Sequence, residues 1–197
     1  MRRVSPSSVL SPTATSILDT AERLAQTRGF NGFSYADISE ALGITKASLH
    51  YHFRTKAELG QRLIARYHDS FAAALEGISA SATTAPAKLK HYVRLYAGVL
   101  RNDRMCLCGM LAAEYTTLPP PMQTEIRRFF DLNEAWLAGV VEDGRRAGTM
   151  TFDGTPEDLA RLLLGSLEGA MLVARTYNDA GRFEASAERL LSELSTG

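Results

Sequence analysis

The sequence predicts an all-α protein of about nine helices, arranged as a small N-terminal unit and a larger C-terminal body. Apolar residues recur three and four positions apart along most of the chain, which is the spacing of one helix face. Serine, threonine, proline and glycine stand at the ends of these segments, where they start and stop helices. The alternating pattern of a strand is almost absent, so the predicted helix content lies far above the usual one-third.

The composition is that of an ordinary globular protein, with 197 residues, 45% of them hydrophobic and 22% charged. It excludes a disordered polypeptide, and no apolar run approaches the roughly 18 residues of a membrane span. The N-terminus lacks the apolar core of a secretory signal, so we expect a cytoplasmic protein with reduced cysteines. The net charge is zero, and residues 1–60 hold only seven Lys and Arg against five acids. This small excess does not by itself indicate a nucleic-acid partner.

The first two helices are indicated by spacing and by the glycines that end them. Residues 1–12, rich in Ser and Pro, predict a flexible arm. Ser34, with Asp37 three positions on, predicts an N-cap for a short second helix that ends at Gly43. The helix before it stops at Gly29, and its apolar face is Ile17, Leu18, Ala21, Leu24 and Ala25.

Residues 34–53 form the most informative unit of the sequence. A third short helix, from Lys46 to Phe53, follows the tight turn Leu42-Gly43-Ile44-Thr45. Two short helices joined by a glycine-containing turn are the helix-turn-helix arrangement, whose second helix enters the major groove of DNA. Thr45 is expected to cap this recognition helix, so that its free N–H groups can face phosphate.

Hydroxyl, lysine and aromatic side chains are the types that contact phosphates and base edges. The outward side chains expected on the recognition helix are Thr45, Lys46, Ala47, Ser48, His50, Tyr51 and His52. We also expect DNA contacts from Ser34 and Tyr35. Lys56 is a further candidate DNA contact. A cation is unfavourable in the first turn of a helix, so we expect this lysine to be kept there for an external phosphate. The alternative is that the helix–glycine–helix pattern arises by chance and that the histidines only cap or pack.

The next three helices begin the C-terminal body. A capping box at residues 55–58 starts a long fourth helix, and residues 79–84, rich in Ser, Ala and Thr, predict a loop. Pro86 opens a fifth helix that extends to about Asn102, and a short sixth helix spans residues 106–115. The apolar face of the fourth helix is Leu59, Leu63, Tyr67, Phe71 and Leu75.

Three further helices complete the body. Three consecutive prolines, residues 119–121, separate the sixth helix from a long seventh helix over residues 122–148. Thr155, followed by a proline and two acids, opens an eighth helix that extends to about residue 178. The ninth helix is expected over residues 183–194, where leucines and alanines recur at helical spacing.

A family resemblance rests on motifs of the N-terminal unit, which are Gly29-Phe30-Asn31-Gly32-Phe33-Ser34, Asp37-Ile38-Ser39 and the run from Ala41 to Leu59. Together they resemble the DNA-binding domain of TetR-family repressors. The resemblance implies a helix-turn-helix domain over residues 13–60 and a ligand-binding and dimerisation domain over residues 61–197. It further implies a homodimeric repressor that a small molecule releases from a near-palindromic operator. One departure is His50, where the family usually carries a tyrosine, and a histidine makes this contact sensitive to pH.

The resemblance places the dimer interface on the eighth and ninth helices. Leu190 and Leu194 are expected to contribute from the ninth helix. Small side chains on the eighth helix would let a second subunit approach closely, and these are Gly165, Ser166, Gly169 and Ala170. The alternative is that the small residues pack within one subunit.

The interior of the C-terminal domain is where the resemblance places an effector. Such sites combine an apolar lining with one or two polar anchors. The candidate lining residues are His68, Tyr92, Tyr96, Cys106, Cys108, Met110, Glu114, Tyr115, Phe129, Asn133, Trp136 and Met171. His68, Glu114 and Asn133 are the candidate anchors, and the alternative for the rings and methionines is a packed core.

The two cysteines, Cys106 and Cys108, stand two positions apart. In a helix such residues point about 200° apart, so they are not expected to form a disulfide with each other. No spaced set of Cys and His completes a metal site, and no cofactor is expected. Either both thiols are small buried hydrophobes, or one has a lowered pKa and senses electrophiles or oxidants. The second interpretation rests on a short resemblance to repressors of the same family that respond to reactive electrophiles.

Two other classes of function were weighed against a DNA-binding repressor. An enzyme needs a nucleophile and a base in one cleft, and the only histidine pair lies on the predicted DNA face. A helical adaptor without DNA binding would carry an acidic or apolar recognition helix, which this sequence does not have. We therefore predict a DNA-binding regulator, possessing no enzymatic activity, that is released by an effector.

Overall fold

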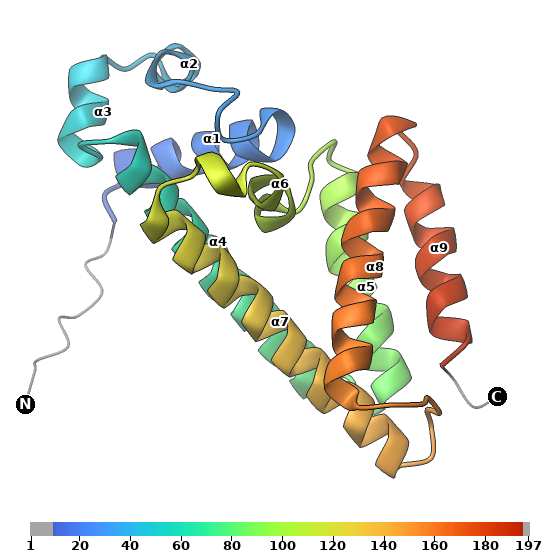
Figure 1. The fold of residues 1–197 in the computed structure, drawn as a ribbon. Coiled ribbons are helices and arrows are strands. Elements are labelled where there is room, and N and C mark those ends of the chain that lie inside the picture. Colours follow the sequence, from blue (N-terminus) through green and yellow to red (C-terminus); the bar gives the residue numbers. More distant parts are fainter. Residues whose placement is uncertain (1–9, 195–197) are drawn as a thin grey trace, which may run out of the picture.

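The computed structural model describes residues 10–194, which contain nine α-helices, a short 3-10 helix and no strand (Figure 1). Residues 1–9 of the expected arm lie outside this range. The helices are α1 Pro12–Arg28, α2 Tyr35–Leu42, α3 Lys46–His52, α4 Lys56–Ser81, α5 Ala85–Leu100, α6 Leu107–Ala113, α7 Pro120–Arg146, α8 Pro156–Thr176 and α9 Ala180–Ser192. The predicted all-α class is confirmed, and no helix in the described range is long and apolar enough to cross a bilayer.

Several boundaries differ from the expected ones because the chain continues or tightens locally. The expected arm ends earlier, since Ser11 accepts a hydrogen bond from the backbone of Ala14 and α1 begins at Pro12. The expected loop over residues 79–84 is shorter, because α4 continues to Ser81. The sixth helix is also shorter than predicted, and a 3-10 turn, Tyr115–Thr117, leads from it toward the prolines.

Helices α1–α3 and the start of α4 form a small lobe around a shared apolar core (Figure 1). Ile17, Ile38, Leu49 and Leu59 are each completely buried there, one from each of the four helices. Burial of such side chains fixes the short helices α2 and α3, which are too short to be stable alone. The lobe therefore holds α3 on its outer surface in a fixed orientation.

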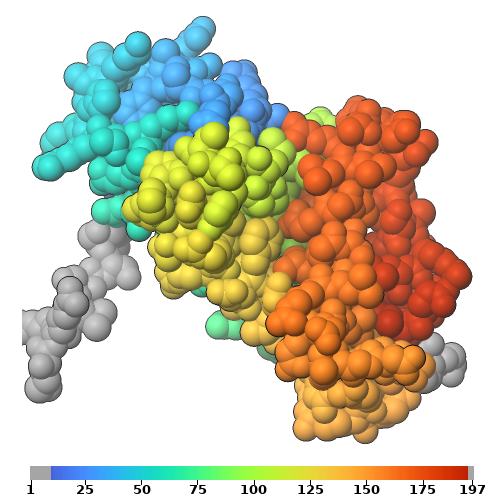
Figure 2. Space-filling model, viewed as in Figure 1, coloured from blue at the N-terminus to red at the C-terminus, as the bar shows by residue number. Residues whose placement is uncertain are grey.

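The remaining helices form the larger body. Helices α4 and α7 run side by side along its length, while α8 packs against both α7 and α9 (Figure 1). The short helix α6 contacts α1, α4 and α7, so it lies between the small lobe and the body. The surface view shows α8 exposed along one face of the molecule, next to α9 (Figure 2).

Candidate functional site

The turn between α2 and α3 is built around a glycine in the left-handed region. Gly43 has φ 63° and ψ 28°, which a residue with a Cβ adopts only at a cost. Its N–H donates to Glu40 and the N–H of Ile44 donates to Ser39, so the end of α2 is closed by the turn itself. The predicted helix-turn-helix geometry follows directly from this cap.

The outer face of α3 is open to solvent. Thr45 accepts a hydrogen bond from the backbone N–H of Ser48 at 3.1 Å and so caps the helix as predicted. Tyr51 is the most exposed large apolar side chain described, at 85%. Ser48 and His52 are half-buried, and the other exposed positions are Thr45, Lys46, Ala47 and His50. This face presents hydroxyl, amine and aromatic groups together.

Tyr35 and His50 position α3 from within the lobe. The hydroxyl of Tyr35 donates to the carbonyl of Phe53 at 2.9 Å, and the Tyr35 ring lies 4.9 Å from that of His50. Burial, with a smaller contribution from Glu58, raises the pKa of Tyr35 to about 12. Nδ1 of His50 lies 3.1 Å from the carbonyl of Arg54, which can only accept, so this nitrogen carries the proton.

Ser34 acts as a helix cap. It accepts from the backbone N–H of Ala36, and its own N–H and hydroxyl donate to Asp37 at 2.8 and 2.7 Å. These bonds lower the pKa of the Asp37 carboxyl. The side chain stays exposed while holding the start of α2.

Lys56 has a different role from the phosphate contact that its charge suggested. Its ammonium donates to the carbonyls of Phe30 and Phe33, each at 2.5 Å, and lies over both phenyl rings. Burial lowers the pKa of Lys56, while the nearby carboxylates of Glu114 and Asp37 oppose that shift. The predicted phosphate contact is therefore corrected, because Lys56 ties the loop after α1 to the start of α4.

The interior of the body contains a cluster of aromatic rings. Its members are Tyr67, Phe71, Tyr92, Tyr96, Phe129 and Trp136, with neighbouring ring centres 5.1–6.1 Å apart. The Tyr92 hydroxyl donates to Asn133 at 2.7 Å, and the Asn133 amide donates to the carbonyl of Phe129 at 2.8 Å. The structure thus brings five of the predicted lining residues together and buries Met171 in the same core, while Tyr67 and Phe71 were not predicted as lining residues.

Both cysteines are buried beside this cluster. Cys106 precedes α6 and Cys108 lies within it, and the two are 1% and 0% exposed. Burial raises the pKa of each thiol, and the carboxylate of Glu168 adds to the effect. The expectation of a lowered thiol pKa is therefore wrong for this conformation, because the surroundings are apolar and the nearest charge is negative.

Glu168 is a site residue that the sequence analysis missed. It comes from α8, its carboxylate oxygens are shielded from solvent, and no N–H or O–H group of the described residues donates to them, so that the Cys106 thiol is the neighbour that interacts with the carboxylate. Burial raises the pKa of this carboxyl to about 7, with the neighbouring Cys106 thiol working in the opposite direction. The available signal was that Glu168 is the one charged residue between Arg161 and Arg175 of an otherwise apolar helix.

Four predicted lining residues face other partners. The ring of His68 lies 3.1 Å from the exposed carboxylate of Asp69. The hydroxyl of Tyr115 accepts from Arg127. Met110 accepts from Arg175, and Glu114 accepts from the backbone N–H groups of the loop after α1. These placements correct the prediction that His68 and Glu114 anchor an effector.

Contacts between α6 and the end of α1 link the lobe to the body. The Glu114 carboxylate accepts from the backbone N–H groups of Phe30, at 2.7 Å, and Asn31. The backbone N–H of Met105 donates to Gln26 at 3.2 Å. Arg175 of α8 donates to the carbonyl of Thr27 and to the sulfur of Met110. The lobe is thus held by residues on both sides of α6.

The outward face of α8 carries small and apolar residues. A Cβ added at Gly165 or Gly169 would meet no atom within 4 Å, so neither glycine is needed for packing within the described chain. Large apolar side chains that are about half exposed are Leu162, Leu172 and Val173 on this helix and Tyr177 directly after it. Ser166, Ala170 and Leu190 are half-buried beside them, while Leu194 is buried and belongs to the core instead of a free surface.

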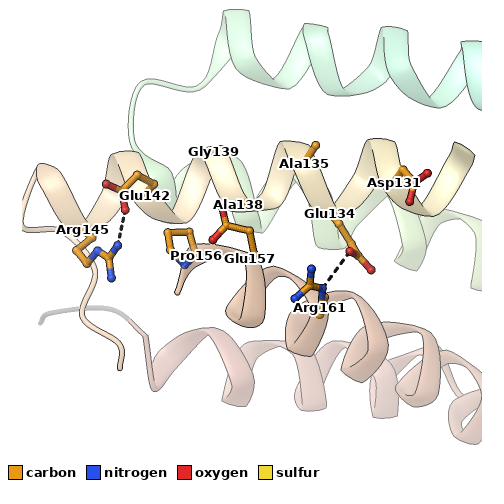
Figure 3. A pocket seen from close by; sticks show the side chains of 10 residues that line it. All are labelled: Asp131, Glu134, Ala135, Ala138, Gly139, Glu142, Arg145, Pro156, Glu157 and Arg161. Atoms are coloured by element: carbon orange, nitrogen blue, oxygen red, sulfur yellow. Dashed lines mark hydrogen bonds and ion pairs between the residues drawn. The ribbon is translucent and has the colours of Figure 1, made fainter. Parts of the chain in front are cut away.

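A surface groove between α7 and α8 is lined by six charged side chains together with alanine, glycine and proline (Figure 3). Arg145 pairs with Glu142 at 2.6 Å, and Arg161 pairs with Glu134 at 3.4 Å (Figure 3). These two ion pairs neutralise both arginines of the groove, so neither guanidinium is left without an acidic partner.

Two family models match the chain. "Bacterial regulatory proteins, tetR family" covers residues 17–63, which include the helix-turn-helix, and "Tetracyclin repressor-like, C-terminal domain" covers residues 85–190. The crystal structure of a TetR-family regulator from Agrobacterium tumefaciens superposes with a TM-score of 0.90 at 32% identity, over 93% of this chain and 97% of that chain.

Curated relatives are transcriptional repressors. DhaR of Mycobacterium sp. (strain GP1) is 24% identical over 82% of this chain and 81% of its own length. NemR of Escherichia coli (strain K12) is 25% identical over 81% of this chain and 82% of its own length. A structure of the reduced form of E. coli NemR superposes with a TM-score of 0.80 at 23% identity, over 93% of this chain and 98% of that chain. The chain therefore belongs to the TetR family and is a DNA-binding transcriptional regulator, not an enzyme.

Proposed function

We propose that this regulator is a homodimeric repressor that binds a near-palindromic operator and is released by a small-molecule effector held inside the C-terminal body. The observation that carries the DNA-binding part is the outer face of α3. Tyr51 has 85% of its surface exposed and, among the rings of the described residues, contacts only its neighbour His52, edge to face, while Thr45 and Lys46 at the start of the same helix are also exposed. On a rigid lobe, such a face suits insertion into a major groove.

The outward face of α8 supports the dimer. Exposed glycines beside half-exposed apolar side chains allow two helices to approach closely and to bury apolar surface. Packing α8 and α9 against their copies would set the distance between two recognition helices. A two-fold dimer then reads two half-sites about 34–36 Å apart.

The contacts around α6 support the route by which an effector acts. The effector site and the lobe share this seven-residue helix, because Cys108 lies on its inner side and Glu114 follows its last turn. An effector that binds better when α6 is displaced would move the lobe. The two recognition helices of the dimer could then no longer bind their half-sites at the same time.

Covalent modification of Cys106 or Cys108 by an electrophile or oxidant is a second candidate for the release step. The likeness to NemR, one of whose structures is a reduced form, favours it. The burial of both thiols opposes it, since a reagent reaches them only when α6 opens.

The test of DNA binding is fluorescence anisotropy with DNA from upstream of the gene, a scrambled duplex as reference, and two salt concentrations. We expect tight binding that prefers the upstream sequence and weakens with salt. Lys46→Ala should lower the affinity and reduce the salt dependence by about one counterion. Lys90→Ala, which removes an exposed lysine of α5 in the body, is the matched control and should not change either quantity. Equal weak binding of both duplexes at low salt would contradict the proposal.

The thiol route is tested by N-ethylmaleimide at pH 7, with mass spectrometry to count modified cysteines and anisotropy to follow operator release. The thiol route would be supported if operator release increases in proportion to cysteine modification and is lost in Cys106→Ser or Cys108→Ser. Complete modification without release would exclude it.

A further inference from the structure

The carboxylate of Glu168 is the strongest unexplained group in the molecule. Both oxygens are shielded from solvent, and no N–H or O–H group of the described residues donates to them. The Cys106 thiol, a weak donor, is the neighbour that interacts with the carboxylate, which is a poor environment for a group that accepts several hydrogen bonds. A Cβ added at Gly109 of α6 would lie 2.3 Å from its Oε2 atom, so the missing side chain of Gly109 makes room for it. The carboxylate therefore points from α8 toward α6, into the core of the body.

The groups that face Glu168 come from three other parts of the fold, and none is cationic. They are Tyr67 of α4, Tyr92 and Tyr96 of α5, and the two cysteines at and after the start of α6. The Tyr92 hydroxyl is already committed to Asn133. Arg175, the next cation along α8, donates to Thr27 and Met110. The described chain thus supplies the carboxylate with no counter-charge.

We propose that Glu168 is the anchor of the effector site and that the effector is an organic ammonium, a protonated amine carrying an apolar group. This inference rests on the proposed function and specifies its ligand. The ammonium would donate to the two carboxylate oxygens, and the apolar group would lie against the aromatic cluster. Rings stabilise a desolvated cation through their negative faces, so the cluster suits the charge as well as the apolar part.

A cation fits this site better than a neutral or anionic ligand. An alcohol has one hydrogen to donate and leaves one oxygen unsatisfied, while a carboxylate adds like charge to the core. An ammonium has three hydrogens and neutralises the site. Because burial raises the pKa of Glu168 to about 7, binding of a cation also ionises a partly protonated carboxyl and releases a proton. The affinity for an amine should therefore increase as pH rises through 7.

The same geometry connects the ligand to DNA release. Gly109 meets Glu168 within α6, and Glu114 at the end of that helix holds the N–H groups of Phe30 and Asn31. A ligand inserted between Glu168 and Gly109 would displace α6. The displacement would loosen the lobe at its main contacts with the body.

The test uses three probes of one shape, 2-phenylethylammonium, 2-phenylethanol and phenylacetate, with the full-length protein. The melting temperature is followed at pH 6.5 and 7.5 for wild type, for Glu168→Gln, and for Glu76→Gln, an exposed glutamate of α4 that serves as control. We expect the ammonium to stabilise wild type and the control more than the alcohol does, and more at pH 7.5, with no stabilisation by phenylacetate. In Glu168→Gln the apparent affinity for the ammonium should fall about tenfold or more.

Equal effects of the ammonium and the alcohol on wild type, or no effect of the ammonium, would overturn the proposal. So would an ammonium effect that persists unchanged in Glu168→Gln. Operator binding by wild type without a probe is measured separately by anisotropy. Its failure would reject the repressor, whereas a failed ammonium preference with intact operator binding would reject only the ligand class.

Discussion

Glu168 makes the stability of the protein depend on pH in an unusual direction. Its pKa in the fold is about 7, above the ordinary value of 4.5. A group with a raised pKa in the fold stabilises the folded state below the unfolded pKa, and this contribution is lost as pH rises through the folded pKa. Without a ligand, the buried carboxyl is thus tolerated as an acid and disfavoured as an anion.

We predict that the free energy of unfolding of wild type falls by about 2 kcal/mol between pH 5 and pH 8 through this carboxyl alone. Glu168→Gln removes the titration, so the variant should be the more stable protein at pH 8. Urea unfolding of both proteins at the two pH values measures the difference. If the free energy of unfolding changes with pH by the same amount in wild type and in Glu168→Gln, the carboxyl of Glu168 does not have the raised pKa.

At the scale of the helix, much of the fold could be predicted because its signals are local. Thr45, Thr55 and Thr155 each accept a backbone N–H at the start of a helix, and the sequence shows all three. Ser81 could not be recognised as the last residue of α4, because Ser and Ala allow either a helix or a loop. Tertiary packing decides such ends.

The candidate site was predicted less well because its interactions join distant parts of the chain. Glu114 was expected to face an effector, but its partners lie 83 and 84 positions away, in the loop after α1. Lys56 was expected to face phosphate for a similar reason, since its partners Phe30 and Phe33 become neighbours only in the folded lobe. Spacing along one helix does not contain this information.

The exposed face of α8 gives a prediction at the same scale. Gly169→Arg places a long cation in open space, so the monomer should fold with slightly higher stability, by about 0.5–1 kcal/mol, because glycine is a poor helix former. The proposed dimer should dissociate, since two copies would bring like charges together. Gly77→Arg on α4, also in open space, is the control and should leave the dimer intact. Analytical ultracentrifugation would contradict the assigned face if Gly169→Arg stays dimeric.

For the whole molecule, the proposed mechanism requires that the link between lobe and body transmit ligand binding to the recognition helices. The lobe has its own apolar core, and α4 continues from it into the body. Other polar contacts form where the end of α1 and the loop after it meet Met105, Glu114, Thr117 and Arg175. Two parts that are each rigid and share a small polar contact can change their relative angle without unfolding.

Glu114→Ala should therefore reduce the effect that effector binding in the body has on operator affinity. The change removes the acceptor for Phe30 and Asn31 N–H groups, and we expect a loss of stability of about 1–3 kcal/mol. Circular dichroism should remain that of a helical protein, while operator affinity falls and an effector shifts it less than in wild type. Glu134→Ala, which removes only an exposed ion pair on α7, is the control and should respond to the effector as wild type does. A full effector response in Glu114→Ala would mean that α4, and not the contact with α6, transmits the change to the recognition helices.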